Sequence, residues 1–252
     1  MEVHHHAHTS RKKWSHYFWE FLMLFLAVFC GFIAENQREH YIEHQREKQF
    51  MTTLIHDLQN DTSNFARSIR VFQFNVDKFD SLKNSIKAPK SEQDILSIYK
   101  VSTLIQNFSS FNYSDRTIEQ LRSAGNFRLV RKSKVSDRLI EYDRYIRHTY
   151  LALENILENN SIKLMDMQHE LVDYDAYDYV NSIKWASWQS TTIDSLPFEL
   201  KLVTTDEKKL AQYYNAFGAY RNWCKRMVTH SNIAKKDATK LIELIREEYH
   251  FN

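Results

Sequence analysis

Residues 14–34 read WSHYFWEFLMLFLAVFCGFIA, and the rest of the chain is organised around this stretch. Its uncharged run, residues 21–34, is short for a helix that must cross ~30 Å of hydrocarbon at ~1.5 Å per residue. Residues 17–19 extend the apolar stretch backwards, interrupted by Glu20. Aromatic residues near its start, preceded by the basic triplet 11–13, are typical of a membrane–water interface. We therefore expect residues 14–34 to form a transmembrane anchor that contacts the lipid bilayer.

A buried core helix, for which an apolar run of this length is typical, and two cleavable segments are the alternatives to an anchor. A signal peptide could end at Ala34, but Phe32 stands two residues before that end, where a small residue is needed. A lipoprotein would use Cys30, and Phe29 again stands where a small residue is needed. Both mismatches favour an uncleaved single span.

The orientation follows from the basic residues that flank the span. The triplet 11–13 lies directly against one end, whereas Arg38, Arg46 and Lys48 follow the other end at a distance. A long domain after a span crosses the membrane largely regardless of its charge. We expect residues 1–13 to be a cytoplasmic tail and residues 35–252 to lie outside that membrane, which is the periplasm if the source is a bacterium with an inner and an outer membrane.

The tail is rich in histidine. A remnant of a purification tag is one interpretation, and a native tail that loosely binds a transition metal is the other. A run without fixed geometry makes a poor specific site, so we expect no dedicated metal centre or other cofactor. The histidines concerned are His4, His5, His6 and His8.

Composition predicts an all-α fold. The chain has three Gly and two Pro in 252 residues, far below the usual ~7% and ~5%. Sandwiches, barrels and nucleotide-binding α/β folds need many more glycine turns.

The net charge of +2 gives no electrostatic case for a nucleic-acid partner. We expect no disulfide, because Cys30 lies in the anchor and Cys224 in the body.

Apolar residues at alternating three- and four-residue steps predict long helices at about 35–86, 136–172 and 206–249, packed as an elongated bundle. In the first helix Thr62 occupies a skipped turn, and in the second we expect Leu153 on the buried face. The stripe of the first helix comprises Met51, Leu54, Ile55, Leu58, Phe65, Ile69, Phe72, Val76 and Phe79.

Polar residues mark the helix ends. Residues 91–94 are typical of a capping box, Gly125 of a helix C-terminus, and Ser136 and Asp206 of helix starts. Between residues 173 and 205 the pattern breaks up, which predicts an irregular surface segment.

The opening MEVHHH, the span YFWEFLMLFLAVFCGFIAE and the segment TIEQLRSAGNFRLV carry a family resemblance. Over most of its length the chain resembles an uncharacterised bacterial family of single-span, helix-rich inner-membrane proteins. The resemblance implies a native histidine tail and a retained anchor. Because that family has no assigned activity, it implies no functional residue.

One motif fits a metalloprotease. His40, Glu43 and His44 match the inverted zinc pattern H-x-x-E-H, with two histidines one helical turn apart. A zinc site also needs a third ligand and a cleft. On a helix rich in Glu and His, a chance match on a solvated face is the better interpretation.

Two further features invite functional interpretations. Residues 173–178, DYDAYD, partly match a calcium loop but lack its glycine and terminal glutamate. Aromatic residues beside carboxylates also occur in sugar sites, whereas a surface turn that packs onto the helices is the simpler interpretation. Cys224 lies on the apolar stripe, which predicts a core residue.

An acidic ridge is expected just after the span. Its carboxylates follow one another at four-residue steps and form either a solvated face or a docking ridge for a basic partner. The ridge comprises Glu35, Glu39, Glu43 and Glu47.

One face of the anchor combines small residues with a carboxylate, on a helix of 3.6 residues per turn. A small-xxx-small pair lets a second helix approach closely in lipid. The carboxylate lies at the edge of this face, where it could serve an ion path or extend to the headgroups. The face comprises Glu20, Ala27, Gly31 and Ala34.

Three classes of function remain. The first is a non-enzymatic, membrane-anchored scaffold or interaction protein that forms homo-oligomers through its anchor and long helices. The second is a sensor-like or ion-coupled accessory subunit of a larger membrane complex, which uses Glu20. The third is a zinc hydrolase that uses His40, Glu43 and His44.

Overall fold

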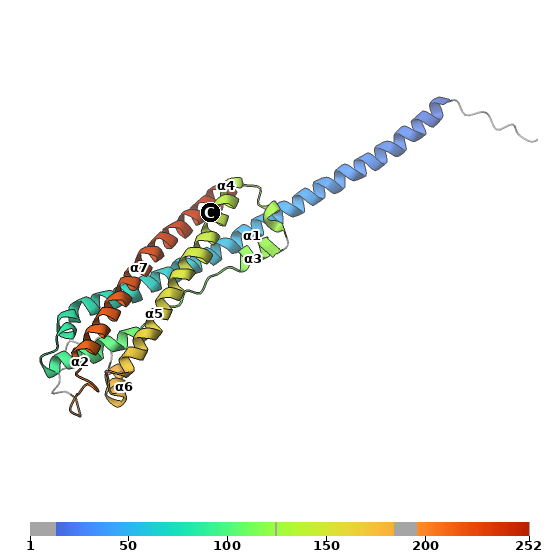
Figure 1. Ribbon diagram of the computed structural model, residues 1–252. Coiled ribbons are helices and arrows are strands. Elements are labelled where there is room, and N and C mark those ends of the chain that lie inside the picture. The colour runs from blue at the N-terminus through green and yellow to red at the C-terminus, as the bar shows by residue number, and fades with distance from the viewer. Residues whose placement is uncertain (1–13, 124, 184–195, 252) are drawn as a thin grey trace, which may run out of the picture. The chain divides into compact units, whose positions relative to one another are not determined.

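The computed structural model describes residues 14–123, 125–183 and 196–251 (Figure 1). These residues form an all-α fold, as the composition predicts. An isolated β-bridge joins Val172 to Leu202. The histidine tail lies outside the described residues.

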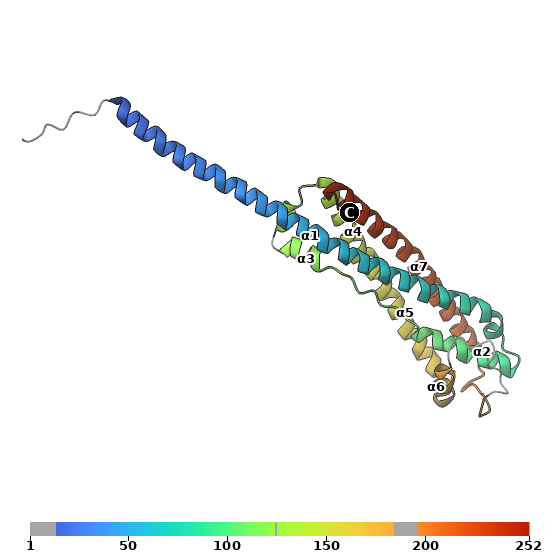
Figure 2. The same ribbon diagram turned by 180° about the vertical axis from the view of Figure 1, so that it is seen from behind.

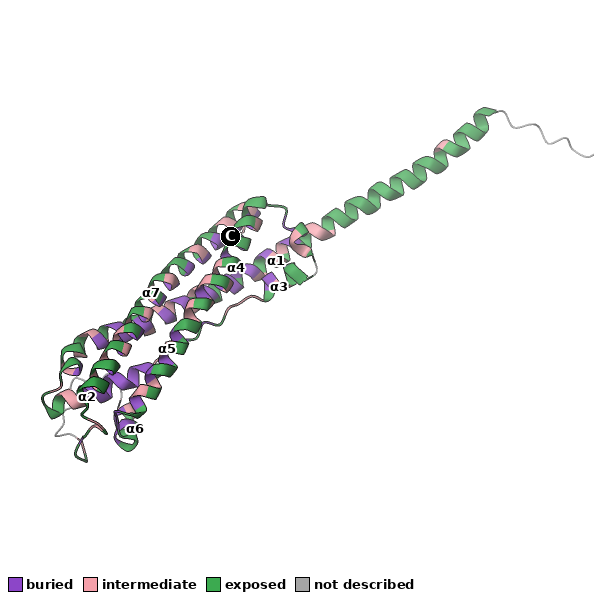
Figure 3. Ribbon diagram, viewed as in Figure 1, coloured by how far each residue is buried: buried purple, intermediate pink, exposed green. Residues whose placement is uncertain are grey.

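The chain divides into two units, Met1–Phe50 and Met51–Asn252. The long helix α1, Trp14–Lys87, runs through the boundary. In the first unit most side chains of α1 are exposed, as its green colour in Figure 3 shows. Among the described residues, α1 is the one helix that is long and apolar enough to cross a membrane. The compact unit begins at Met51, whereas the sequence placed the start of the helical domain at residue 35.

In the second unit, the C-terminal part of α1, the α4–α5 run and α7 lie side by side in both views (Figures 1 and 2). The helices α2 and α6 contact each other. The elements after α1 are α2 (Glu92–Ser102), η1 (Thr103–Gln106), α3 (Arg116–Ser123), η2 (Asn126–Leu129), α4 (Ser133–Tyr145), η3 (Ile146–Tyr150), α5 (Leu151–His169), α6 (Tyr174–Ser182) and α7 (Glu207–Tyr249).

The buried face of α1 keeps the alternating step without a gap. Asp61, 1% exposed, occupies the skipped turn, whereas Thr62, which the sequence suggested, is half-buried. Polar residues recur on this face at a spacing of seven, at Asp61, Ser68 and Asn75. The buried residues at this alternating step are Met51, Leu54, Leu58, Asp61, Phe65, Ser68, Phe72, Asn75 and Phe79, and Ile55, Asp57 and Val76 beside them are buried as well.

The facing helices carry buried tyrosines whose hydroxyls are hydrogen-bonded. Tyr142 donates to Asp61 (Oη–Oδ2 2.7 Å), and Tyr150 bonds Ser231 on α7 (2.9 Å). Tyr213 on α7 bonds Ser102 at 2.7 Å. A buried phenol without a partner would cost free energy, so these pairs let bulky tyrosines fill the core.

The second long helix differs from its predicted form in two ways. It begins at Ser133 and not at Ser136, and Ile146–Tyr150 forms a π-helical turn. Leu153 is only half-buried, which corrects the prediction, although the stripe on both sides of it is buried as predicted. The neighbouring Glu154 is half-buried as well and accepts the Phe111 N–H at 2.7 Å.

The predicted caps are present at three helix ends. Ser91 and Asp94 form the capping box of α2, Gly125 adopts a left-handed φ of 62°, and Asp206 accepts the Lys209 N–H at 2.9 Å to begin α7. The segment expected to be irregular begins with a helix instead, because Asp173 caps α6.

The difference in burial predicts unequal losses of stability for two substitutions of predicted core residues. Phe72→Ala should lower the free energy of unfolding by about 3–5 kcal/mol, because it empties a fully buried site. Leu153→Ala should cost less than half of that, because the side chain is half-buried. Urea unfolding of the full chain in detergent measures both, and equal losses would contradict the partial burial of Leu153.

Candidate functional site

The predicted face of the anchor is exposed along its whole length. Glu20, Ala27, Gly31 and Ala34 are all solvent-accessible in the chain. A Cβ added to Gly31 would meet nothing within 4 Å. Phe21, Phe25 and Phe29 stack on the opposite face, with ring centroids 6.3 and 5.9 Å apart.

Glu20 has a partner one turn toward the basic end of the anchor. Its Oε1 lies 3.4 Å from Nε2 of His16, and both side chains are about half-exposed. This position matches the interfacial interpretation of Glu20, in which a carboxylate extends toward the headgroups.

The acidic ridge is not a continuous surface. Glu35 is exposed and accepts two hydrogen bonds from Arg38, whose guanidinium holds the pKa of this carboxyl below its usual value. Glu39 is exposed. Glu47 is 2% exposed and lies 3.5 Å from His44. Because Glu47 is buried, it cannot contribute to a docking ridge as predicted.

The zinc motif turns toward neighbouring carboxylates. His40 Nδ1 lies 4.0 Å from Glu43 Oε2, and His44 pairs with Glu47. Among residues 14–123, 125–183 and 196–251 no group of three or more His, Cys, Asp or Glu side chains could hold a metal ion. A third zinc ligand is therefore not found in this part of the chain.

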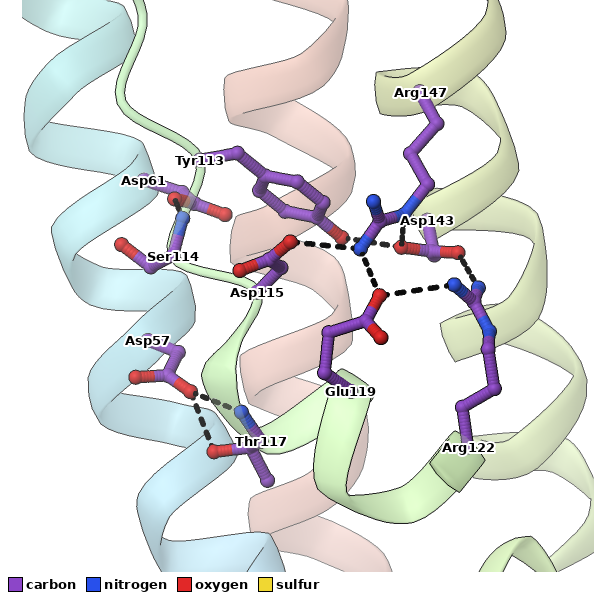
Figure 4. A network of polar contacts seen from close by, with 10 residues as sticks. All are labelled: Asp57, Asp61, Tyr113, Ser114, Asp115, Thr117, Glu119, Arg122, Asp143 and Arg147. Carbon is purple, nitrogen blue, oxygen red and sulfur yellow. Dashed lines mark hydrogen bonds and ion pairs between the residues drawn. The ribbon is translucent and has the colours of Figure 1, made fainter. Parts of the chain in front are cut away.

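The most developed polar site lies in the second unit, and the sequence reasoning missed it (Figure 4). It begins at Asp57 on α1, a buried carboxylate that accepts both the N–H (3.1 Å) and the hydroxyl of Thr117. Thr117 lies in the first turn of α3, whose N–H groups have no partner within the helix. Asp57 thus caps α3 from another helix.

Asp61 anchors the chain just before α3. It accepts the Ser114 N–H at 2.9 Å and the Tyr142 hydroxyl at 2.7 Å. Burial raises the pKa of this carboxyl from 3.8 to about 6; the two hydrogen bonds oppose that rise, and the neighbouring Asp57 adds to it. Asp61 therefore titrates close to neutral pH.

Asp143 on α4 is the centre of the charged part of the network. Tyr113 donates its hydroxyl to this buried carboxylate at 2.9 Å, and the guanidinium groups of Arg122 and Arg147 bind it as well. Arg147 also reaches Asp115 (2.8 Å) and Glu119 (2.6 Å), as the dashed lines in Figure 4 show.

The same polar face of α1 continues beyond this network. Ser68 lies 3.4 Å from the Ser109 hydroxyl, and Asn75 and Asn107 exchange hydrogen bonds of 2.6 and 2.8 Å. Together with the Asp61–Ser114 bond, these contacts fix the segment between η1 and α3 along α1. We call this set of contacts, from Asn75 to Asp57 on α1, the polar seam.

Polar residues at core positions were the one signal that could have revealed this site. Asp57 and Asp61 lie four residues apart, within the apolar stripe of the first long helix. Buried carboxylates require partners, so their position predicts a polar contact. The partners lie about fifty residues away along the chain and have no local pattern.

Cys224 lies in the core, as predicted. Burial raises the pKa of its thiol to about 12, an effect that hydrogen bonds from Tyr220 and Asn75 only reduce. The thiol is protonated at neutral pH, and a protonated buried thiol is a poor nucleophile.

Comparison of the chain with protein-family models, with curated proteins and with solved structures finds no match.

The raised pKa of Asp61 predicts a pH dependence of stability. The folded state holds this proton more tightly than the unfolded chain, so the free energy of unfolding should fall by about 3 kcal/mol in total as the pH rises from well below 3.8 to well above about 6. Asp61→Asn should remove this decline. Urea unfolding at several pH values measures it.

Two other groups titrate nearby and need their own controls. Burial also raises the pKa of Glu154, which acts in the same direction, so Glu154→Gln separates its share. Burial lowers the pKa of His230, which acts in the opposite direction. An unchanged slope in Asp61→Asn would contradict the assignment to Asp61.

The charged network predicts that substitutions of two arginines lower the stability by different amounts. Arg147→Met should lower the free energy of unfolding by about 2–3 kcal/mol, because it leaves the buried Asp143 with one cation in place of two. Arg138→Met is the matched control, since its pairs with Glu141 and Asp237 are more exposed, and it should cost under about 1 kcal/mol. Thermal unfolding that ranks the two equally would contradict a structural role for the network.

Proposed function

We propose that this chain is a membrane-anchored, non-enzymatic scaffold or interaction protein that self-associates through its anchor and its long helices. The observation that carries the proposal is the exposed apolar surface of α1 in the first unit. A soluble monomer rarely exposes a continuous apolar surface of this extent. The side chains that form it are Trp14, Tyr17, Phe18, Trp19, Phe21, Met23, Leu24, Phe25, Leu26, Val28, Phe29, Phe32 and Ile33.

A lipid bilayer is the partner that fits this surface. None of the most apolar window of α1 is buried in the chain, whereas the core helix of a soluble protein is mostly buried. The segment is helical, so its backbone groups are paired within it, as hydrocarbon requires. The basic triplet before it supports a cytoplasmic N-terminus and a helical domain outside a bacterial inner membrane.

Self-association is supported by the shape of the anchor. Ala27 and Gly31 leave one face free of bulk, while Phe21, Phe25 and Phe29 crowd the opposite face. In lipid, close packing and hydrogen bonds hold helices together, and small residues permit the necessary approach. The buried polar side chains of the second unit are engaged mainly in holding the fold, which supports a role in binding over one in catalysis.

Glu20 keeps the second class of function open. An accessory subunit of an ion-coupled complex would bury this carboxylate against a partner helix. Its pair with His16 favours the interfacial alternative. Co-purification of a polytopic membrane protein that is lost in Glu20→Gln would favour the accessory subunit.

Gly31→Ile is the sharpest test of self-association. Because a side chain at Gly31 meets nothing in the same chain, this substitution leaves the monomer intact and changes only contacts with a partner. A cysteine-free parent protein should form a crosslinked dimer in native membranes, and Gly31→Ile should reduce the yield of that dimer at least about fivefold. Phe29→Ile, on the opposite face, is the matched control and should leave the dimer unchanged.

A phosphatase fused after Asn252 reports the orientation in the same membranes. It should be active outside the cytoplasm. Activity of an N-terminal fusion alone would reverse the orientation, and release of the chain by alkaline carbonate would exclude an anchor. Equal crosslinking of Gly31→Ile and Phe29→Ile would be consistent with a membrane anchor but would contradict self-association through the small-residue face.

A further inference from the structure

Carboxylates outnumber arginines around the start of α3, in the second unit (Figure 4). All but one of these carboxylates lie within salt-bridge distance of an arginine. The exception is Asp61, which pairs with no cationic side chain among the described residues. The carboxylates are Asp57, Asp61, Asp115, Glu119 and Asp143, and the arginines are Arg116, Arg122 and Arg147. When every group is ionised, the cluster therefore has an excess of negative charge.

Asp61 is the member of this cluster that best accommodates a proton. Its side chain is 1% exposed, and its hydrogen-bond donors, the Ser114 N–H (2.9 Å) and the Tyr142 hydroxyl (2.7 Å), are both uncharged. When ionised, this carboxylate loses its hydration without gaining a counter-charge, and the neighbouring Asp57 repels it. The neutral form keeps both contacts, because one oxygen still accepts from Ser114 and the other donates its proton to Tyr142.

The titratable and charged groups around Asp61 come from several elements. They are Asp57 on α1, Tyr113 and Asp115 in the connecting segment, Arg116, Glu119 and Arg122 on α3, Tyr142 and Asp143 on α4, and Arg147 on η3. The helix α7 adds no charge, because all of its buried residues are uncharged. Burial raises the pKa of the Tyr113 and Tyr142 hydroxyls, so both phenols stay neutral.

The helix α3 depends on the carboxylates of α1 for its start. It is eight residues long, and a helix of this length is not stable alone. Its first N–H groups need acceptors from outside the helix, and Asp57 accepts from Thr117 while Asp61 accepts from Ser114, just before the helix. Two apolar side chains, Ile118 and Leu121, complete its buried face. A short helix with so few buried contacts opens more readily than the long helices of the core.

We propose that Asp61 is a proton-dependent latch for residues 113–123, which we call the α3 segment. The segment is docked on α1 when Asp61 is protonated, and it opens locally when Asp61 is ionised. Opening moves Ser114 away and lets water hydrate the carboxylate, while the long helices stay packed. The proposal concerns the second unit alone and does not rest on self-association of the anchor.

The direction and the size of the effect follow from proton linkage. Burial raises the pKa of Asp61 from 3.8 to about 6 in the docked state, and water restores the ordinary value once the segment opens. The proton therefore stabilises the docked state, and this stabilisation is lost as the pH rises through about 6. Between about pH 5 and about pH 7.5 the opening equilibrium should increase about tenfold.

Hydrogen exchange of the full chain in nanodiscs tests the proposal by mass spectrometry. After correction for the intrinsic pH dependence of exchange, protection of the α3 segment should fall about tenfold between about pH 5 and about pH 7.5. At both pH values it should lie at least about tenfold below the protection of the core of α7, because the segment opens without global unfolding. Equal protection of the two would show that the segment opens only when the whole unit unfolds, and would overturn the proposal.

Asp61→Asn copies the protonated form, because its amide accepts from Ser114 and donates to Tyr142. At about pH 7.5 this variant should protect the α3 segment about tenfold better than the parent does, and the pH dependence should disappear. If the carboxylate were needed only as a strong acceptor, Asp61→Asn would instead weaken the protection. Asp137→Asn, at an exposed position on α4, is the matched control and should behave like the parent.

The remaining outcomes overturn the latch. Weaker protection in Asp61→Asn at about pH 7.5, or failure of this variant to fold, would show that the ionised carboxylate holds the segment. Full pH dependence that persists in Asp61→Asn would assign the effect to another group, and Glu154, which accepts the Phe111 N–H, is the nearest such group along the segment. No change with pH in the parent would contradict any proton-linked opening.

Discussion

The need to pair polar groups on the buried face of α1 shapes the second unit. At Asp61, Ser68 and Asn75 the core contains groups that cost free energy when they are left alone. Their partners come from two directions. Tyr142 and Tyr220 extend their hydroxyls from the facing helices, and the segment between η1 and α3 supplies backbone and side-chain groups. The packing of three long helices therefore depends on where this connecting segment lies.

That segment takes the position along α1 that a fourth helix would hold in a regular bundle. Successive contacts to Asn107, Ser109, Ser114 and Thr117 follow α1 backwards from Asn75 to Asp57. An extended chain has unpaired backbone groups, and a purely apolar helix face could not satisfy them. The carboxylates of α1 accept its N–H groups, and Asp143 with its two arginines secures the same region from the side of α4. The position of the connecting segment and the polar network thus depend on each other.

Apolar spacing sufficed to predict the helices, because a stripe with three- and four-residue steps has few alternatives as a helix face. Polar residues at the helix ends also predicted the caps at Ser91 and Asp206, because capping depends on neighbours in the sequence. Both kinds of pattern failed where the outcome depended on distant partners. The skipped turn was assigned to Thr62 and not to Asp61, because the partners of Asp61, Ser114 and Tyr142, are remote in sequence. Leu153 follows the stripe but is only half-buried, and the neighbouring Glu154 has its partner, Phe111, far away in the sequence.

The seven-residue spacing of the polar positions has a consequence for alignment. Apolar residues repeat along α1 so regularly that sliding the helix by one heptad, about 10 Å, would again place hydrophobic side chains against the core. The polar residues at these positions differ in kind: a carboxylate, a hydroxyl and an amide. After such a slide Asp61 would take the place of Ser68 in one direction or of Leu54 in the other, and Asn75 would lose the amide that it pairs with. Because each type of side chain requires its own partner, the three polar residues favour the native alignment of α1 over alignments shifted by one heptad.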